Sequence, residues 1–190
     1  MRTLTTILSL SLLLTGLTVA QSADPTIKDI DIKCKVIQDK LDTYDTTRTT
    51  IGGQSTEDGE LTGYYDKDNL KLMTVVYYGE TGKRQTDYYF DNGQLCFVQD
   101  IFYRYNRPIY WDGTKAKENR DTVAFDSDKT EINEHDRYYF DSKELIHWID
   151  WSGRPGDKRL ATFKNRENSI PKEVDELKEK LKESTGANTR

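Results

Sequence analysis

Few side chains of this sequence have the chemistry expected of a catalyst. The chain has two histidines, His135 and His147. Counted from a two-residue turn at 142–143, His135 is expected opposite Asp150 on a neighbouring strand. Such a pair could act as the acid–base dyad of a hydrolase, because histidine exchanges protons near neutral pH. A surface cross-strand pair needs the same spacing and is the interpretation that we favour.

Metal and cofactor sites have weaker support. In the same register His147 is expected opposite Tyr138, on the other face from His135, so one metal ion could not readily use both histidines. The acidic stretches 66–69 and 126–131 resemble fragments of a calcium-binding loop, but both lack its glycine and its terminal glutamate. We therefore predict no metal and no cofactor.

Common catalytic motifs are missing from the sequence. It contains no G-x-S-x-G, phosphate-binding loop, Rossmann glycine set, H-E-x-x-H or C-x-x-C. Cys34 could act as a nucleophile only beside a histidine, and nothing in the sequence places one there. A protein that binds a partner is therefore favoured over an enzyme.

The segment FYRYNRPIYWDG, residues 102–113, is unusually rich in aromatic residues. Tyr103, Tyr105, Tyr110 and Trp111 form the candidate binding site, because aromatic rings beside polar groups give a large contact area at a small cost in entropy. The alternative is a strand end followed by a loop that caps the core with its own rings.

The two cysteines, Cys34 and Cys96, are predicted to form a disulfide. Cys34 lies on the apolar stripe of a predicted helix, and Cys96 lies in a predicted hairpin that this stripe could cover. An exported protein reaches an oxidising compartment in which disulfides persist. The alternative is a pair of buried free thiols.

Two similar segments of the sequence contain several of these residues and indicate how they are positioned. DYYFDNGQLCFVQD, residues 87–100, and RYYFDSKELIHWID, residues 137–150, share six of fourteen positions. Asn92-Gly93 is a strong signal for a two-residue hairpin turn, since both turn residues need positive φ. The repeat is therefore a β-hairpin. A degenerate third copy, GYYDKDNLKLM at 63–73, is expected to have a turn one residue shorter.

The turn also predicts which side chains share a face of the sheet. Phe90 is expected opposite Leu95 and Phe140 opposite Leu145, and side chains alternate between faces along a strand. One face then carries Tyr88, Phe90, Leu95, Phe97, Tyr138, Phe140 and Leu145. The opposite face carries Tyr89, Cys96, Val98, Tyr139, Ile146 and Trp148. Both faces are apolar enough to need cover: either a helix lies on each, or one face is a partly exposed aromatic surface.

The flanking segments predict helices. Ile30, Cys34, Ile37, Leu41 and Tyr44 recur at helical spacing, which indicates a helix over about 26–44. A second apolar stripe, Ile170, Val174, Leu177 and Leu181, indicates a C-terminal helix with Pro171 in its first turn and a frayed end within 166–190. The fold class is α+β: an antiparallel sheet of about six hairpin strands over about 60–164, ending in a short strand at LATF, within one domain spanning 21–165.

The first twenty residues predict export. Arg2, an apolar run and the small residues of Thr18-Val19-Ala20 form the pattern of a signal peptide over 1–20. Its removal takes away one arginine and no acidic residue, so the net charge changes from −5 to −6. Such acidity argues against nucleic acid and against anionic membranes as partners after cleavage. The expected location is the periplasm or the cell exterior.

The hairpins YYFDNGQLCFV and YYFDSKELIHW resemble those of uncharacterised bacterial exported proteins, and more distantly the MORN-type repeat, in which an aromatic strand, an Asn-Gly turn and a second strand recur. The likeness covers about 30 residues well. The period of 50 and the missing glycine pattern depart from MORN repeats. The resemblance implies an interaction or scaffold role and carries over no catalytic residue.

The sequence thus favours an exported, non-catalytic, protein-binding or accessory module of the bacterial envelope. One alternative is a carbohydrate- or cell-wall-binding domain that uses residues 102–113. The other is a hydrolase that uses His135 and Asp150.

Overall fold

The computed structural model describes residues 24–52 and 58–187, so the predicted signal peptide at 1–20 lies outside the described residues. Seven strands form one antiparallel sheet, in which each strand pairs with the next along the chain. The strands are β1 (Asp45–Ile51), β2 (Gly59–Asp66), β3 (Asn69–Gly79), β4 (Gly82–Asp91), β5 (Gln94–Arg104), β6 (Glu131–Asp141) and β7 (Glu144–Ile149).

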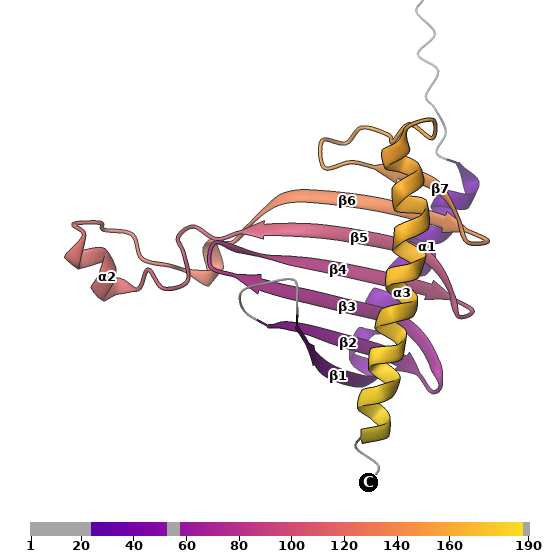
Figure 1. Ribbon diagram of the computed structural model, residues 1–190, viewed down its shortest axis with the longest axis horizontal. Helices are drawn as coiled ribbons and strands as arrows, with labels where there is room; N and C mark the ends of the chain where they lie inside the picture. Colours follow the sequence, from indigo (N-terminus) through magenta and orange to yellow (C-terminus); the bar gives the residue numbers. More distant parts are fainter. Residues whose placement is uncertain (1–23, 53–57, 188–190) are drawn as a thin grey trace, which may run out of the picture.

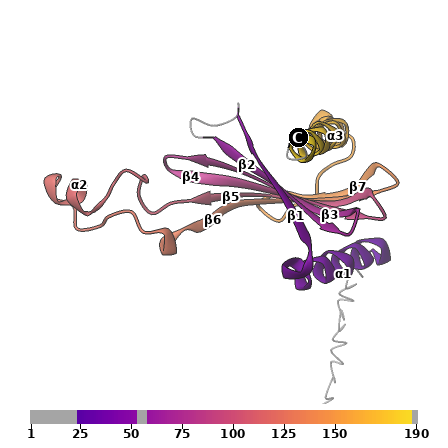
Figure 2. The ribbon, with the colours of Figure 1, turned by 90° about the horizontal axis from the view of Figure 1, so that it is seen from below.

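One long helix lies on each face of the sheet. Helix α3 (Ala161–Ala187) crosses one face and α1 (Pro25–Asp39) lies against the other (Figures 1 and 2). A short helix, α2 (Gly113–Glu118), lies in the connection between β5 and β6, and two 3-10 helices span Leu41–Thr43 and Ser127–Lys129. The predicted α+β class is confirmed, and of the two alternatives for the faces of the sheet the structure has a helix on each.

Helix α1 forms for local reasons that its sequence shows. The side chain of Asp24 accepts a hydrogen bond from the Thr26 amide at 2.9 Å, and Pro25 stands in the first turn, where its missing N–H costs little. The predicted stripe is confirmed: Ile30, Cys34 and Ile37 are buried against the sheet. The helix ends earlier than predicted, at Asp39.

The sheet extends over a different range from the one predicted. Its first strand is β1, a threonine-rich segment that precedes the predicted range of about 60–164; threonine is β-branched and suits a strand. The predicted last strand at 160–163 is instead the start of α3, and the sheet ends at Ile149. Pro171 therefore stands well inside α3 and not in its first turn.

Each of the three hairpins contains the same irregularity next to its turn. In the first repeat Phe90 faces Leu95 as predicted, but Tyr89 faces Phe97 and leaves Cys96 as an extra residue. Such a β-bulge shifts the pairing of every residue beyond it by one. The equivalent extra residues of the other two hairpins are Lys71 and Ile146.

The bulges correct the predicted faces. Phe97 lies on the α1 side of the sheet, in one apolar cluster with Tyr89 and Tyr139, and not on the other face as predicted. Val98 and Trp148 pack on the α3 side, also opposite to the prediction. The third repeat has a turn of the same length as the others, and not the shorter turn that was predicted. Its Tyr64 and Tyr65 occupy the positions that Tyr89 and Phe90 have in the first repeat.

Two separate cores result. The larger core, between the sheet and α3, includes Tyr88, Phe90, Tyr138, Phe140, Phe163 and Leu181. The smaller core, under α1, includes Ile30, Cys34, Ile37, Leu72, Tyr89, Cys96, Phe97 and Tyr139. Beyond both helices the sheet continues towards the lobe that carries α2 (Figure 1), and there no helix covers either face (Figure 2).

Candidate functional site

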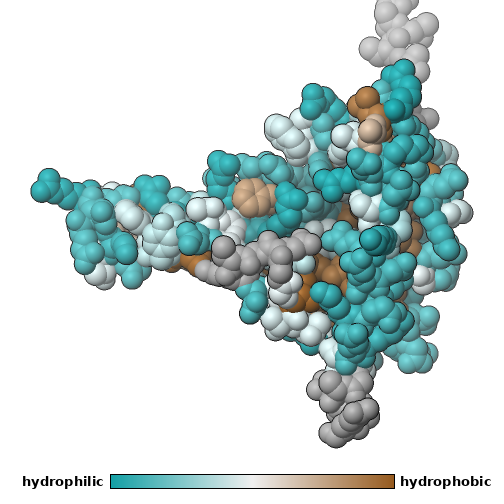
Figure 3. Space-filling view, in the orientation of Figure 1, coloured by the Kyte–Doolittle hydropathy of each residue, from teal (hydrophilic) through white to brown (hydrophobic). Residues whose placement is uncertain are grey.

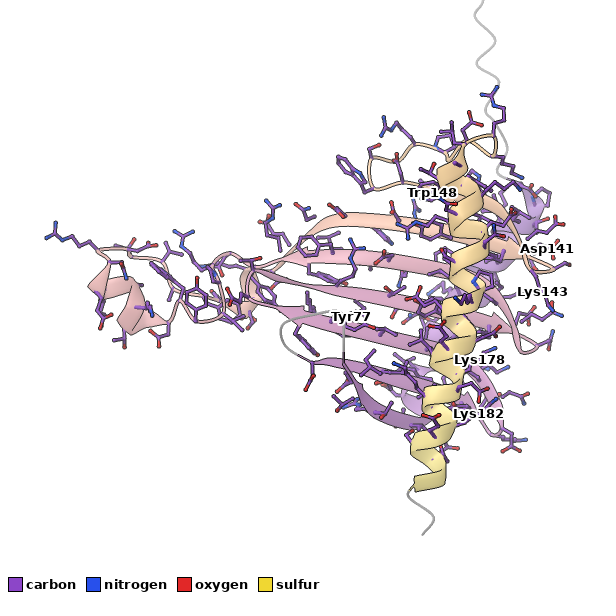
Figure 4. All side chains as sticks on the ribbon, in the orientation of Figure 1. Tyr77, Asp141, Lys143, Trp148, Lys178 and Lys182 are labelled. Atoms are coloured by element: carbon purple, nitrogen blue, oxygen red, sulfur yellow. The ribbon has the colours of Figure 1, made fainter. Side chains whose placement is uncertain are left out.

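A groove runs along the junction between α3 and the sheet. Figure 3 shows apolar surface of the sheet beside α3 within a frame of hydrophilic side chains, and Tyr77 lies there on β3 (Figure 4). The groove has a volume of about 400 Å³. We call it the α3 groove; it is lined by Tyr77, Arg84, Thr86, Tyr88, Val98, Asp100, Tyr138, Arg166, Ser169, Ile170, Lys172, Glu173 and Glu176.

Asp100 is a partly buried acid that lines the α3 groove. Arg84 Nη1 donates to Asp100 Oδ2 at 3.2 Å, and Thr86 Oγ1 donates to Oδ1 at 3.3 Å. Arg84 also reaches Glu134 on β6, at 3.3 Å. Burial raises the pKa of Asp100 although Arg84 opposes the shift. Asp100 is therefore protonated more readily than an exposed aspartate.

Glu173 supplies a second such carboxyl group, from α3. Burial raises its pKa, while a hydrogen bond from the Tyr88 hydroxyl favours the charged form, and the charge of Asp100 adds to the rise. Burial also raises the pKa of Tyr88, so its hydroxyl keeps its proton at neutral pH. The groove thus presents two carboxyl groups whose protonation depends on their low-dielectric surroundings.

A third carboxylate adjoins these two. Asp136 stands directly opposite Asp100 on the neighbouring strand. Tyr138 Oη donates to Asp136 Oδ2 at 3.1 Å, while Asp136 Oδ1 is buried with no hydrogen-bond partner. Arg166 lies over the ring of Tyr138, 5.8 Å from its centroid. Like charges directly opposite one another destabilise a sheet, so this arrangement needs compensation by positive charge.

The charges of the α3 groove do not balance when these neighbours are included. The lining contains three basic side chains, Arg84, Arg166 and Lys172, and three acidic ones, Asp100, Glu173 and Glu176. Glu134 and Asp136, which contact Arg84 and Tyr138 respectively, make the acidic side chains the majority. Chemically, the groove offers hydrogen-bond acceptors and negative charge between tyrosine rings, which suits a basic or hydrogen-bond-donating ligand.

The four aromatic residues predicted from 102–113 do not form one surface. Tyr103 points to the α1 side of the sheet, with Lys83 5.0 Å from its ring centroid. Tyr105 packs edge-on against Phe125, with 5.3 Å between centroids. Trp111 is partly buried, and only Tyr110 is half exposed, at 50%. Most of these rings pack within their own loop or on the sheet.

The predicted pair of His135 and Asp150 is not brought together. The bulge in the β6–β7 hairpin shifts the pairing, so His135 is not opposite Asp150, and on its other side it faces Ile101 of β5. Asp150 instead accepts hydrogen bonds from the amides of Ser152 and Arg154, each at 2.9 Å. The hydroxyl of Ser152, which donates to Asp150 Oδ1 at 2.6 Å, and these amides hold the pKa of Asp150 at about 2. Asp150 organises a turn.

His147 occupies an apolar setting. It faces Tyr139 and not Tyr138, again because of the bulge, and the two rings lie 5.9 Å apart. Burial lowers the pKa of His147, and the same cause lowers the pKa of His135, whose Nε2 is buried without a hydrogen-bond partner. Both imidazoles are therefore held towards their neutral form.

The sequence reasoning missed the residues of the α3 groove. A signal was present on one strand: Arg84, Thr86 and Tyr88 alternate along β4 and so share a face. The bulge places Asp100 opposite Thr86, which the assumed register did not. Glu173 lies on a helix about seventy residues further along, and only the docking of α3 brings it to the sheet.

Two searches of the described residues found nothing. Within 24–52 and 58–187, no group of three or more His, Cys, Asp or Glu side chains is placed to hold a metal ion. In the same part of the chain, no helix combines the length and apolar composition needed to cross a bilayer. Comparisons of the chain with protein-family models, curated proteins and solved structures give no match.

Proposed function

We propose that this protein is an exported, non-catalytic binding module that receives a basic segment of a partner protein in the α3 groove. The observation that carries the proposal is the surplus of acidic side chains around a groove that also contains tyrosine rings. A lysine or arginine of the partner would compensate the opposed carboxylates of Asp100 and Asp136.

The charged groups of the groove support binding more than catalysis. Arg84 holds Asp100 and Glu134 through two hydrogen bonds, and Tyr88 holds Glu173. Groups fixed in this way are pre-organised, so little side-chain entropy is lost when a ligand arrives. Tyrosine and arginine are also the residue types that commonly dominate binding energy at protein interfaces.

The first test is an affinity capture followed by a variant series. Tagged protein, residues 21–190, is incubated with soluble envelope proteins at low and moderate salt, and a stoichiometric partner is purified for calorimetric titration. We expect the double variant Glu134→Gln/Glu176→Gln to weaken this binding at least tenfold, since two exposed acidic groups near the groove are lost. The control is Glu60→Gln, an acidic residue of β2 that lies outside the groove.

The result against the proposal is equally specific. If the double variant binds as tightly as the wild type, or if the control loses as much affinity as the double variant, the α3 groove does not hold the partner. Weak dependence of the affinity on salt would also contradict it, because attraction between exposed charges is screened by salt.

Carbohydrate binding is a second candidate, supported by one observation. The ring of Tyr110 is 50% exposed at the end of the molecule that carries α2, with Lys115 5.8 Å from its centroid. Retention of the protein on purified cell-wall glycan, abolished by Tyr110→Ala but unaffected by Glu134→Gln/Glu176→Gln, would transfer the function to this loop. Loss of partner-protein binding in the groove variant, with no loss in Tyr110→Ala, would support the first proposal.

A further inference from the structure

The helix α1 and the sheet meet at two cysteines. Cys34, on the buried stripe of α1, is 8% exposed, and Cys96, on β5, is 7% exposed. Both belong to the small apolar core under α1, and both are free thiols in this structure. Two residues more than sixty positions apart in the sequence are thus brought into one small core.

The β-bulge explains why Cys96 reaches the helix. Cys96 is the extra residue of its hairpin, between Leu95 and Phe97, and its Sγ lies 3.4 Å from the carbonyl oxygen of Tyr89. In the other two hairpins the extra residue also lies on the α1 side: Lys71 lines a pocket beside α1, and Ile146 packs against the small core. The bulges therefore form a row on which α1 rests, and Cys96 stands in the middle of that row.

We propose that Cys34 and Cys96 form a disulfide that fixes α1 to β5 in the exported protein. The burial of both thiols in the same small core provides the geometry, and the expected export provides the oxidising compartment. This proposal is independent of the α3 groove, because α1 and α3 lie on opposite faces of the sheet (Figure 2) and residues of α3 line the groove. It concerns a covalent cross-link within the protein and not the partner that the protein binds.

The chemistry requires an external disulfide as oxidant, such as oxidised glutathione or a disulfide oxidoreductase. The thiolate of Cys96 attacks one sulfur of that oxidant, which forms a mixed disulfide and releases one thiol. The thiolate of Cys34 then attacks Cys96 Sγ and releases the second thiol. Overall, two S–H bonds are lost, one S–S bond forms, and two electrons and two protons reduce the oxidant.

Because both sulfurs are buried in the docked structure, the exchange takes place while α1 is undocked, during folding. The same disulfide results if Cys34 attacks the oxidant first and Cys96 completes the exchange.

The bond would matter because few other contacts hold α1. Its buried apolar residues besides Cys34 are Ile30 and Ile37. Lys33 pairs with Asp91 at 2.8 Å, and Gln38 donates to the hydroxyl of Tyr89. An isolated helix of this length is marginal in water, and closing a loop of about 60 residues restricts the unfolded chain strongly.

The deciding experiment is the intact mass of protein 21–190 after refolding with oxidised glutathione. We expect the mass to rise by about 2 Da on reduction, and a peptide joining Cys34 to Cys96 to appear in a non-reducing digest. Reduction should lower Tm by about 10 °C. The double variant Cys34→Ala/Cys96→Ala should show no change in Tm with reductant, which controls for other effects of the reagent.

One result would overturn the proposal without any variant. If the wild-type mass and Tm are the same with and without reductant after refolding with oxidised glutathione, the two thiols do not pair. Mixed glutathione adducts on either cysteine would also overturn it, because the second step would then have failed. Loss of partner binding by the α3 groove would leave this measurement unchanged, so the two proposals fail separately.

Discussion

At the residue scale, Asp87 is a buried acidic side chain outside the α3 groove that needs hydrogen-bond donors around it. It is 3% exposed and accepts hydrogen bonds from neutral side chains. The donors are Thr74 Oγ1 at 2.8 Å, Gln99 Nε2 at 2.8 Å and Gln85 Nε2 at 3.1 Å. A buried carboxylate is tolerated only with such a complete set of partners.

We expect Asp87→Ala to lower the free energy of unfolding by about 2 kcal/mol, because it leaves buried donors without an acceptor. Urea denaturation followed by circular dichroism measures the change. Asp45→Ala, on the exposed part of β1, is the matched control and should be close to neutral. Equal effects of the two substitutions would contradict the assigned role of Asp87.

Glu173 gives a prediction about pH. Its pKa is raised in the folded protein, mainly by burial. A carboxyl group of this kind binds its proton more tightly in the folded state than in the unfolded state. It therefore stabilises the fold at pH values below its unfolded pKa, and this contribution is lost as the pH rises through its folded pKa.

We expect Glu173→Gln to reduce the loss of stability between about pH 4.5 and pH 7, since glutamine can still accept the Tyr88 hydrogen bond and has no charge to bury. Asp100 shifts in the same direction, so some pH dependence should remain. Urea midpoints measured across this range test the prediction. The exposed Glu179→Gln should keep the wild-type profile; a Glu173→Gln profile that also matches the wild type would refute it.

At the element scale, the pairing of β4 with β5 depends on a close approach of their backbones at one end as well as on the apolar pattern. Gly82 begins β4, and a Cβ atom built there would lie 2.3 Å from the carbonyl oxygen of Tyr103 on β5. Since that contact is with backbone, a side-chain rotation cannot relieve it. The two strands would have to move apart.

Gly82→Ala should therefore lower the free energy of unfolding by about 2 kcal/mol or more. Gly113→Ala is the control, because a Cβ at Gly113 meets nothing within 4 Å. Thermal and urea denaturation of the two variants should separate them clearly. A neutral Gly82→Ala would mean that β4 and β5 adjust more easily at this end than close packing implies.

Helix α3 contains a second constraint, at Pro171. The helix continues through this residue although proline has no N–H to donate to the carbonyl four residues earlier. We expect Pro171→Ala to raise the free energy of unfolding by about 1–3 kcal/mol, through the restored hydrogen bond and the better helix propensity. Chemical denaturation measures it. A loss of stability would show that α3 needs the local geometry of proline to follow the sheet.

At the scale of the whole molecule, α3 completes the larger core. It contributes Phe163, Ile170, Val174, Leu177 and Leu181 to the cluster that contains four buried rings of the repeated hairpins. A protein that ends at 160 would expose those rings. We expect it to lose cooperative unfolding and to bind a hydrophobic dye strongly. A chain that ends at Ala187 is the control; a cooperative transition in the shorter chain would contradict this view of the core.

Much of the architecture follows from sequence alone, because it depends on short-range rules. The repeated hairpins, the helical stripe of α1 and the stripe from Ile170 to Leu181 are visible as periodicity and turn signals. The α+β class follows, since sheet faces rich in aromatic residues must be covered. The strand β1 was not predicted because its threonines lack an apolar alternation, and the interior position of Pro171 was not predicted because proline favours the first turn of a helix; tertiary contacts decide both.

The faces of the sheet, by contrast, were decided by the tertiary structure. A single extra residue in the first repeat reverses the predicted faces of Phe97 and Val98. The extra residue in the β6–β7 hairpin removes the expected pairing of His135 with Asp150. Because side chains alternate with a period of two, an error of one residue reverses every assignment beyond it. The sequence by itself determined the repeated hairpins and the apolar stripes of α1 and α3. The packing of these helices on a bulged sheet determined which side chains meet, in the α3 groove and in the core that holds Cys34 and Cys96.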